Sequence, residues 1–133
     1  KLQESRYRTA ALAHGVASVV RDMKAKLIVV WSQQGGAARY LSQNRLRIPI
    51  WACTSDQIAL RRMNILYGVQ PILLDLPEDT PAFLYQIDQL LLASKACEPG
   101  DPIVVVSGTP LGSVGVTNTL RIHYVGDMCR INP

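Results

Sequence analysis

The chain has little of the residue types on which metal binding and covalent catalysis depend. Among its 133 residues are three cysteines and two histidines. An odd number of irregularly spaced cysteines argues against a disulfide framework and a zinc site, so we expect reduced, structural thiols, with a reactive thiol as the alternative. No GxSxG, HExxH or Walker pattern is present, and neither His14 nor His123 belongs to a nucleophile motif. We therefore expect no catalytic residues, no metal site, and structural or surface roles for both histidines.

Long apolar runs and aromatic residues are also scarce. The longest apolar run, Leu27–Trp31, is far shorter than the roughly 20 residues of a membrane helix. The chain begins with mostly polar and charged residues, so we expect no signal peptide, no membrane partner and a cytoplasmic location. Aromatic residues make up 6% of the chain and are not interleaved with a basic stripe, so we expect no nucleic-acid partner.

The chain does have enough apolar residues for one core. Apolar residues make up 48% of it, and a length of 133 is typical of one domain, so we predict a single domain over 1–133. The net charge of +4 is uneven: residues 1–66 carry eleven Lys/Arg against three Asp/Glu, and residues 67–133 carry three against seven. A basic half suits an anionic partner such as a phosphate ligand, although the scattered cations favour an ordinary solvated surface.

Hydrophobic periodicity predicts alternating helices and strands. Helices are predicted over 5–24 and 37–44, between a Thr54 or Ser55 cap and Gly68, and from a Thr80 cap to Ser94. Strands are predicted over 27–31, 48–53, 70–74 and 102–106. Residues 119–125 alternate between polar and apolar, which predicts a strand with one wet side or an edge strand.

This order of elements predicts an α/β fold of three layers, αβα. Strands that alternate with helices form a mainly parallel sheet covered on both faces. The last two strands are joined without a helix, so we expect strand 5 to be antiparallel to strand 4. Right-handed crossovers then give a five-stranded mixed sheet of order 3-2-1-4-5.

Two loops rich in glycine and hydroxyl residues follow the strands on either side of the predicted switch point, where open α/β sheets bind their ligands. They indicate a phosphate-type ligand, because exposed N–H groups and a helix N-terminus attract anions. Two ordinary tight turns are the alternative. The residues expected to bind are Ser32, Gln33, Gln34, Gly35, Gly36 and Ala37 in the first loop, and Ser107, Gly108, Gly112, Ser113, Gly115 and Thr117 in the second.

Several stretches resemble the C-terminal alpha/beta domain of pyruvate kinase. Residues 66–71 resemble that family's "GV-x-P" strand entry, residues 100–110 its "GD-x-VVV-x-SG-x-P", and residues 115–122 its "G-x-TN-x-LRV" ending. The resemblance spans about residues 10 to 125 and implies the fold derived above. It also implies that phosphoryl transfer from phosphoenolpyruvate to ADP takes place in a preceding barrel domain of the same chain, with magnesium and potassium. This segment alone is then not catalytic.

The resemblance implies an effector pocket for a sugar phosphate or AMP. The family's first loop reads roughly "T-x-S-G-x-[ST]-A-R". Ser32 fills the first hydroxyl position here, whereas Gln34 and Ala37 replace the other two hydroxyl residues. Each lost hydrogen bond to a charged group costs about 1.5–3 kcal/mol, so a monophosphate or no effector is expected rather than a bisphosphate.

The last strand is the second candidate site, because an unpaired sheet edge invites pairing with another chain. The family often forms a two-fold contact through this strand and nearby helices, so we predict a homo-oligomer contact. The residues expected in it are Thr119, Arg121, His123 and Val125. Two alternatives to a kinase regulatory domain stay open: a stand-alone phosphometabolite- or nucleotide-binding module without kinase activity, and a small flavin- or nucleotide-using enzyme. The missing GxGxxG fingerprint disfavours the second.

Overall fold

Helices and strands alternate along the chain up to the fourth strand, and a fifth strand completes the fold. The computed structural model describes residues 2–108 and 117–128, and their side chains from residue 7 onward. The helices are α1 (Leu2–Met23), α2 (Gly36–Gln43), α3 (Gln57–Met63) and α4 (Thr80–Ala93). The strands are β1 (Ile28–Trp31), β2 (Ile50–Thr54), β3 (Val69–Leu73), β4 (Pro102–Ser107) and β5 (Thr119–Tyr124). The predicted order of elements is confirmed.

The five strands form one sheet in the order β3-β2-β1-β4-β5. β1 pairs in parallel with β2 and β4, and β2 pairs in parallel with β3. β5 runs antiparallel to β4, with Ile103 opposite His123 and Val105 opposite Arg121. The predicted α/β class, strand order and strand directions are therefore confirmed. The connection without a helix reverses the chain direction, as the sequence indicated.

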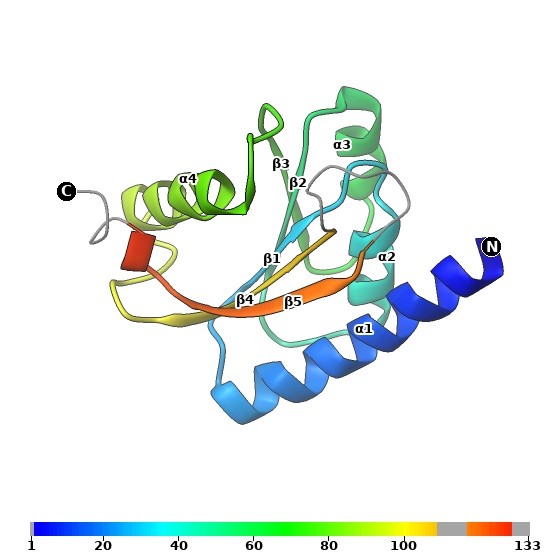
Figure 1. Cartoon of the computed structure of the whole chain (residues 1–133), viewed down its shortest axis with the longest axis horizontal. Coiled ribbons are helices and arrows are strands. Elements are labelled where there is room, and N and C mark those ends of the chain that lie inside the picture. Colours follow the sequence, from blue (N-terminus) through cyan, green and yellow to red (C-terminus); the bar gives the residue numbers. More distant parts are fainter. Residues whose placement is uncertain (1, 109–116, 129–133) are drawn as a thin grey trace.

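The helices cover the two faces of the sheet unequally (Figure 1). α1, α2 and α3 pack on one face, and α4 packs on the other. In β1, Ile28 and Val30 belong to the core under the three helices, whereas Val29 and Trp31 belong to the core under α4. This two-sided burial explains why β1 is apolar at every position rather than at every second one.

The helix caps differ from the predicted ones by one or two residues. Asp56 caps α3 by accepting a hydrogen bond from the N–H of Ile58 at 2.9 Å, and Asp79 caps α4 in the same way. The prediction of Thr54 or Ser55, and of Thr80, as caps is therefore wrong. In both places an aspartate lies next to the predicted hydroxyl residue, and its carboxylate is the preferred acceptor at a helix N-terminus.

The third helix also ends earlier than predicted. α3 stops at Met63 with Asn64 as its C-cap, whereas Gly68 lies in the turn that leads into β3. Gly68 has a φ of 71°, and its carbonyl accepts a hydrogen bond from the N–H of Ile50 at 2.9 Å. Its left-handed conformation therefore serves the entry into β3 rather than the end of a helix.

Three basic residues occupy left-handed positions where a helix has just ended. Lys24, Arg45 and Lys95 have φ values of 53°, 47° and 61°. After α4, the N–H of Ala96 donates to the carbonyl of Leu91 at 3.1 Å, which is the hydrogen bond of a Schellman motif. Glycine is the usual residue at this position because a Cβ atom strains the left-handed conformation.

Replacing Lys95 with glycine is expected to raise the free energy of unfolding. Relief of backbone strain exceeds the added entropy of the unfolded chain, and we expect a net gain of about 0.5–1 kcal/mol. Urea denaturation followed by circular dichroism measures the change. Lys95→Ala is the matched control, because it removes the same exposed side chain and keeps the Cβ atom. An equal gain in both variants would assign the effect to charge and contradict the strain explanation.

Candidate functional site

The loop after β1 is ordered by its own serine. Ser32 is buried, and its Oγ accepts a hydrogen bond from the N–H of Ala38, in the first turn of α2, at 3.2 Å. The carbonyl of Ser32 accepts the N–H of Gly35 at 3.2 Å, and Gly35 adopts a φ of 92°. Among the described residues, the N–H groups of Gly36 and Ala37 have no acceptor. The start of α2 therefore presents two free donors and the positive end of the helix dipole.

Gln33 connects this loop to the loop after β2. The hydroxyl of Thr54 donates to the carbonyl of Gln33 at 2.9 Å, and the Gln33 Nε2 donates to the hydroxyl of Ser55 at 2.7 Å. The N–H of Ser55 donates back to the Gln33 Oε1 at 3.4 Å. The side chain of Gln33 thus contacts the β2 loop, and its polar atoms serve to fix the two loops to each other.

The loop after β4 meets the first loop next to α1. Ala37 and Thr117 line one small gap under α1, which leaves no room for a water molecule. Ser107 is buried, and its carbonyl accepts the N–H of Asn118 at 3.2 Å. Gly108 is buried directly after β4. Gly112, Ser113 and Gly115 lie outside the described residues. The structure therefore brings the two predicted loops together at Ala37 and Thr117.

A larger groove opens on the other side of α2, toward α3. Its volume is about 440 Å³, and it is lined among others by Gln34, Gly35, Gly36, Arg39, Arg62 and Ile65. Sequence reasoning did not assign a binding role to the two arginines. The adjacent pair Arg61-Arg62 was the feature of the sequence that could have pointed to this groove. Only the fold shows that Arg62, and not Arg61, lines it.

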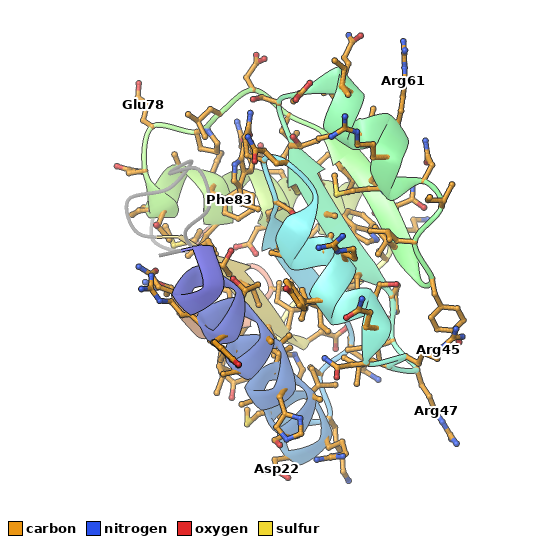
Figure 2. The ribbon with its side chains drawn as sticks, turned by 90° about the vertical axis from the view of Figure 1, so that its right-hand side faces the viewer. Asp22, Arg45, Arg47, Arg61, Glu78 and Phe83 are labelled. Atoms are coloured by element: carbon orange, nitrogen blue, oxygen red, sulfur yellow. The ribbon has the colours of Figure 1, made fainter. Side chains whose placement is uncertain are left out.

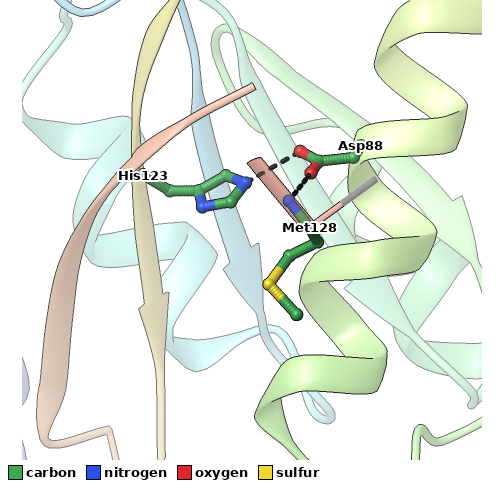
Figure 3. A network of polar contacts seen from close by, with 3 residues as sticks. All are labelled: Asp88, His123 and Met128. Atoms are coloured by element: carbon green, nitrogen blue, oxygen red, sulfur yellow. Dashed lines mark hydrogen bonds and ion pairs between the residues drawn. The ribbon is translucent and has the colours of Figure 1, made fainter. Parts of the chain in front are cut away.

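The predicted contact residues of β5 divide between two environments. Arg121 is exposed, whereas the side chains of His123 and Val125 are buried against the α4 side of the sheet. The Nε2 of His123 lies 2.8 Å from the Oδ1 of Asp88, and the Asp88 Oδ2 accepts the N–H of Met128 at 3.1 Å (Figure 3). Asp88 was not singled out from the sequence.

The other face of β5 is unexpectedly apolar. Ile122 and Tyr124, on this face, are 44% and 42% exposed, whereas Thr119, on the face of Arg121 and His123, is half-buried. Polar and apolar residues alternate over 119–125 as predicted, but the polar ones are not all exposed to solvent. His123 is buried, because it pairs with the buried carboxylate of Asp88. An edge strand with exposed apolar side chains is a surface on which a second chain can pair.

The described cysteines are structural. Burial raises the pKa of the Cys53 thiol to about 12. Burial and the nearby carboxylate of Asp101 also raise the pKa of Cys97. Both thiols therefore stay protonated and weakly nucleophilic near neutral pH. Cys129 lies outside the described residues.

The described part of the chain offers no metal centre. It contains no group of three or more His, Cys, Asp or Glu side chains that would hold a metal ion. The magnesium and potassium that the family resemblance implies are expected in the barrel domain, outside this chain. None of the helices in the described ranges is long and apolar enough to cross a membrane.

Comparisons with known proteins agree on one family. The family model described as "Pyruvate kinase, alpha/beta domain" matches residues 10–123. A pyruvate kinase from Lactococcus lactis subsp. lactis is 35% identical over 129 residues, which cover 94% of this chain and 26% of that protein. A pyruvate kinase from Staphylococcus aureus (strain USA300) is 32% identical over 117 residues, covering 88% of this chain and 20% of that protein.

A solved structure has the same fold. The crystal structure of a pyruvate kinase from Cryptosporidium parvum matches with a TM-score of 0.79 and 24% sequence identity, over 89% of this chain and 23% of that one. The chain thus spans only 20% to 26% of the length of these proteins.

Proposed function

The chain belongs to the pyruvate kinase alpha/beta domain family, the C-terminal domain of those enzymes, and we propose that it is a domain for effector binding and subunit assembly. One observation carries the effector proposal: the first turn of α2 presents the free N–H groups of Gly36 and Ala37 beside the loop after β4. Gly36 is exposed, and a phosphate on this open side of the turn, outside the closed gap under α1, would accept these hydrogen bonds and lie at the positive end of the helix dipole.

The composition of the loop selects among phosphate ligands. The Ser32 hydroxyl already accepts a hydrogen bond from α2, and Gln33 is engaged with the β2 loop. Gln34 and Ala37 lack hydroxyl groups, so the donors left for a phosphate are the two backbone N–H groups, the Ser32 O–H and the Gln34 amide. Such a site suits one phosphate group, and we propose a sugar monophosphate or an AMP-like effector rather than a bisphosphate.

The assembly proposal rests on β5. This strand forms one edge of the sheet, and Arg121, Ile122 and Tyr124 are exposed on it. A second copy of the chain would cover these side chains in a two-fold contact that forms backbone hydrogen bonds along the strand. His123 and Val125 would support the strand from its buried side instead of touching the partner.

We also propose that the parent protein transfers a phosphoryl group from phosphoenolpyruvate to ADP in the cytoplasm, with magnesium and potassium, in a barrel domain outside this chain. The support is that the relatives are pyruvate kinases of which this chain spans 26% or less. The regulatory role and the catalytic role would then lie on different parts of one polypeptide.

Replacing Ala37 with serine is expected to strengthen effector binding. The new hydroxyl would stand at the position where the family carries serine or threonine, in the first turn of α2. One added hydrogen bond to a phosphate oxygen should raise the affinity about tenfold, the lower end of the range for bonds to charged groups. Calorimetric titration with ribose 5-phosphate, glucose 6-phosphate, fructose 1,6-bisphosphate and AMP measures the change.

The matched control for this test is Ala93→Ser, an exposed alanine in the last turn of α4, far from the loop. Its affinity should equal that of the unmodified chain. Absence of binding heat with all four ligands at millimolar concentration, in both the unmodified chain and Ala37→Ser, would overturn the effector proposal.

A further inference from the structure

The groove between α2 and α3 has the chemistry of a separate ligand site. It lies on the α3 side of α2, whereas the gap between Ala37 and Thr117 lies on the α1 side. The groove shares Gln34, Gly35 and Gly36 with the loop expected to bind the effector, whereas Arg39 and the α3 residues belong to the groove alone. We propose that the groove binds a small amphipathic anion, a phosphate or carboxylate joined to an apolar or aromatic body. This inference goes beyond the effector site proposed above and does not depend on it.

Two arginines give the groove its charge. Arg39 comes from α2 and Arg62 from α3, and both side chains are exposed. No acidic residue is among the side chains that line the groove, and the ion pair found in the described ranges is the distant one between His123 and Asp88. The Arg39 guanidinium lies over the ring of Tyr40, 5.7 Å from its centroid, and neither arginine has a carboxylate partner among the described residues. Two arginines lining one groove suit an oxyanion, which each of them can bind through paired N–H donors.

Part of the groove wall is apolar. Met63, Ile65 and Leu66 line the groove at the end of α3 and in the turn that follows. Ile65 is 88% exposed, although isoleucine is among the residues most often buried in folded proteins. A fully polar ligand would leave this wall in water, whereas a ligand with an apolar body would cover it.

The size of the groove favours a single small molecule. Its volume of about 440 Å³ lies within the range of roughly 300–1,000 Å³ that is typical of small-molecule sites. Gly35 and Met63 both line the groove; Gly35 has a φ of 92°, and a Cβ atom on it would make an ordinary contact of 3.4 Å with the Met63 Cγ. The positive φ, rather than lack of space, favours glycine at this turn.

The test is a calorimetric titration of the 133-residue chain with phenyl phosphate, benzoate and inorganic phosphate. We expect phenyl phosphate or benzoate to bind about tenfold more tightly than inorganic phosphate, because only they cover the apolar wall. Arg62→Gln and Arg39→Gln should each lower the affinity for the tighter ligand about tenfold. Ile65→Ser should lower it to nearly that of inorganic phosphate. The relative strength of phenyl phosphate and benzoate identifies the preferred head group.

The matched control is Arg61→Gln, which removes the same charge one residue away. Arg61 points outward from α3 into solvent (Figure 2) and does not line the groove. Its affinity for the tighter ligand should stay within about twofold of the unmodified chain, since long-range charge effects are screened by salt. Equal losses in Arg61→Gln and Arg62→Gln, or no binding of either aromatic anion at millimolar concentration, would overturn the proposal.

Ala37→Ser separates this proposal from the effector site. It should leave phenyl phosphate and benzoate binding unchanged, because Ala37 lies on the α1 side of α2. If Ala37→Ser strengthens the binding of these anions and Arg62→Gln leaves it unchanged, they occupy the effector site and the groove proposal fails while the effector proposal stands.

Discussion

Replacing Asp88 with alanine is expected to lower the free energy of unfolding by about 3–5 kcal/mol, the cost of breaking one partner out of a buried charged or strongly polar pair. Asp88 is fully buried, and its two oxygens accept hydrogen bonds from His123 and from the N–H of Met128. The alanine variant leaves a buried imidazole and a backbone N–H without an acceptor. Because domains of this size are stable by about 5–15 kcal/mol, urea denaturation should show a large shift in midpoint.

Two further variants test whether the hydrogen bonds are the cause. Asp88→Asn keeps the shape, and its amide can bond to both partners if the imidazole presents an unprotonated Nε2, so we expect a loss of about 1–2 kcal/mol. Asp75→Ala makes the same change as Asp88→Ala in an exposed loop, and it should change stability by less than about 0.5 kcal/mol. A loss below 1 kcal/mol for Asp88→Ala would show that the pair contributes little.

The layered sheet could be predicted because its signals are local. β1 and β4 are short runs that are apolar on both parities, and residues 108–118 are too few for a helical crossover between β4 and β5. Each of these features is decided within about ten residues of chain, so periodicity and connection length suffice. The caps were misplaced because aspartate and a hydroxyl residue compete for the same N–H groups over one or two positions.

The buried polar pair could not be predicted for the opposite reason. Asp88 and His123 are 35 positions apart, and each alone looks like a surface residue. Phe83, Ile87 and Leu91 recur at helical spacing and form the buried face of α4, and Asp88, next to Ile87, is buried with them.

The candidate sites show the same division. The two glycine-containing loops could be placed at one edge of the sheet from topology alone. The contact of Gln33 with Ser55, and the position of Arg39 and Arg62 on one groove, depend on how α2 and α3 lie beside each other, which their spacing in the sequence does not specify. Contacts between side chains of neighbouring loops therefore cannot be predicted from the sequence, because they depend on the relative placement of the helices.

The start of α4 supports the candidate site from the opposite face of the sheet. Phe83 is fully buried, and its ring meets the ring of Trp31 edge to face, with centroids 5.6 Å apart. Trp31 is the last residue of β1 and directly precedes Ser32. The aromatic pair therefore packs under the end of β1, where the first loop begins. Loss of this packing should lower the free energy of unfolding and also remove support from the loop.

Replacing Phe83 with alanine is expected to lower the free energy of unfolding by about 3–5 kcal/mol, because the cavity left under α4 adds to the lost burial and the lost aromatic contact. Phe83→Leu fills most of that cavity and should cost less than about 2 kcal/mol. Urea denaturation followed by tryptophan fluorescence measures both changes and also reports on Trp31 itself. The matched control is Tyr7→Ala, which removes an aromatic ring that is 69% exposed and should change stability by less than about 0.5 kcal/mol. If Phe83→Ala lowered the free energy of unfolding no more than Tyr7→Ala, the prediction would be contradicted. The core under α4 would then fill the cavity by rearrangement, and the end of β1 before Ser32 would not depend on this ring.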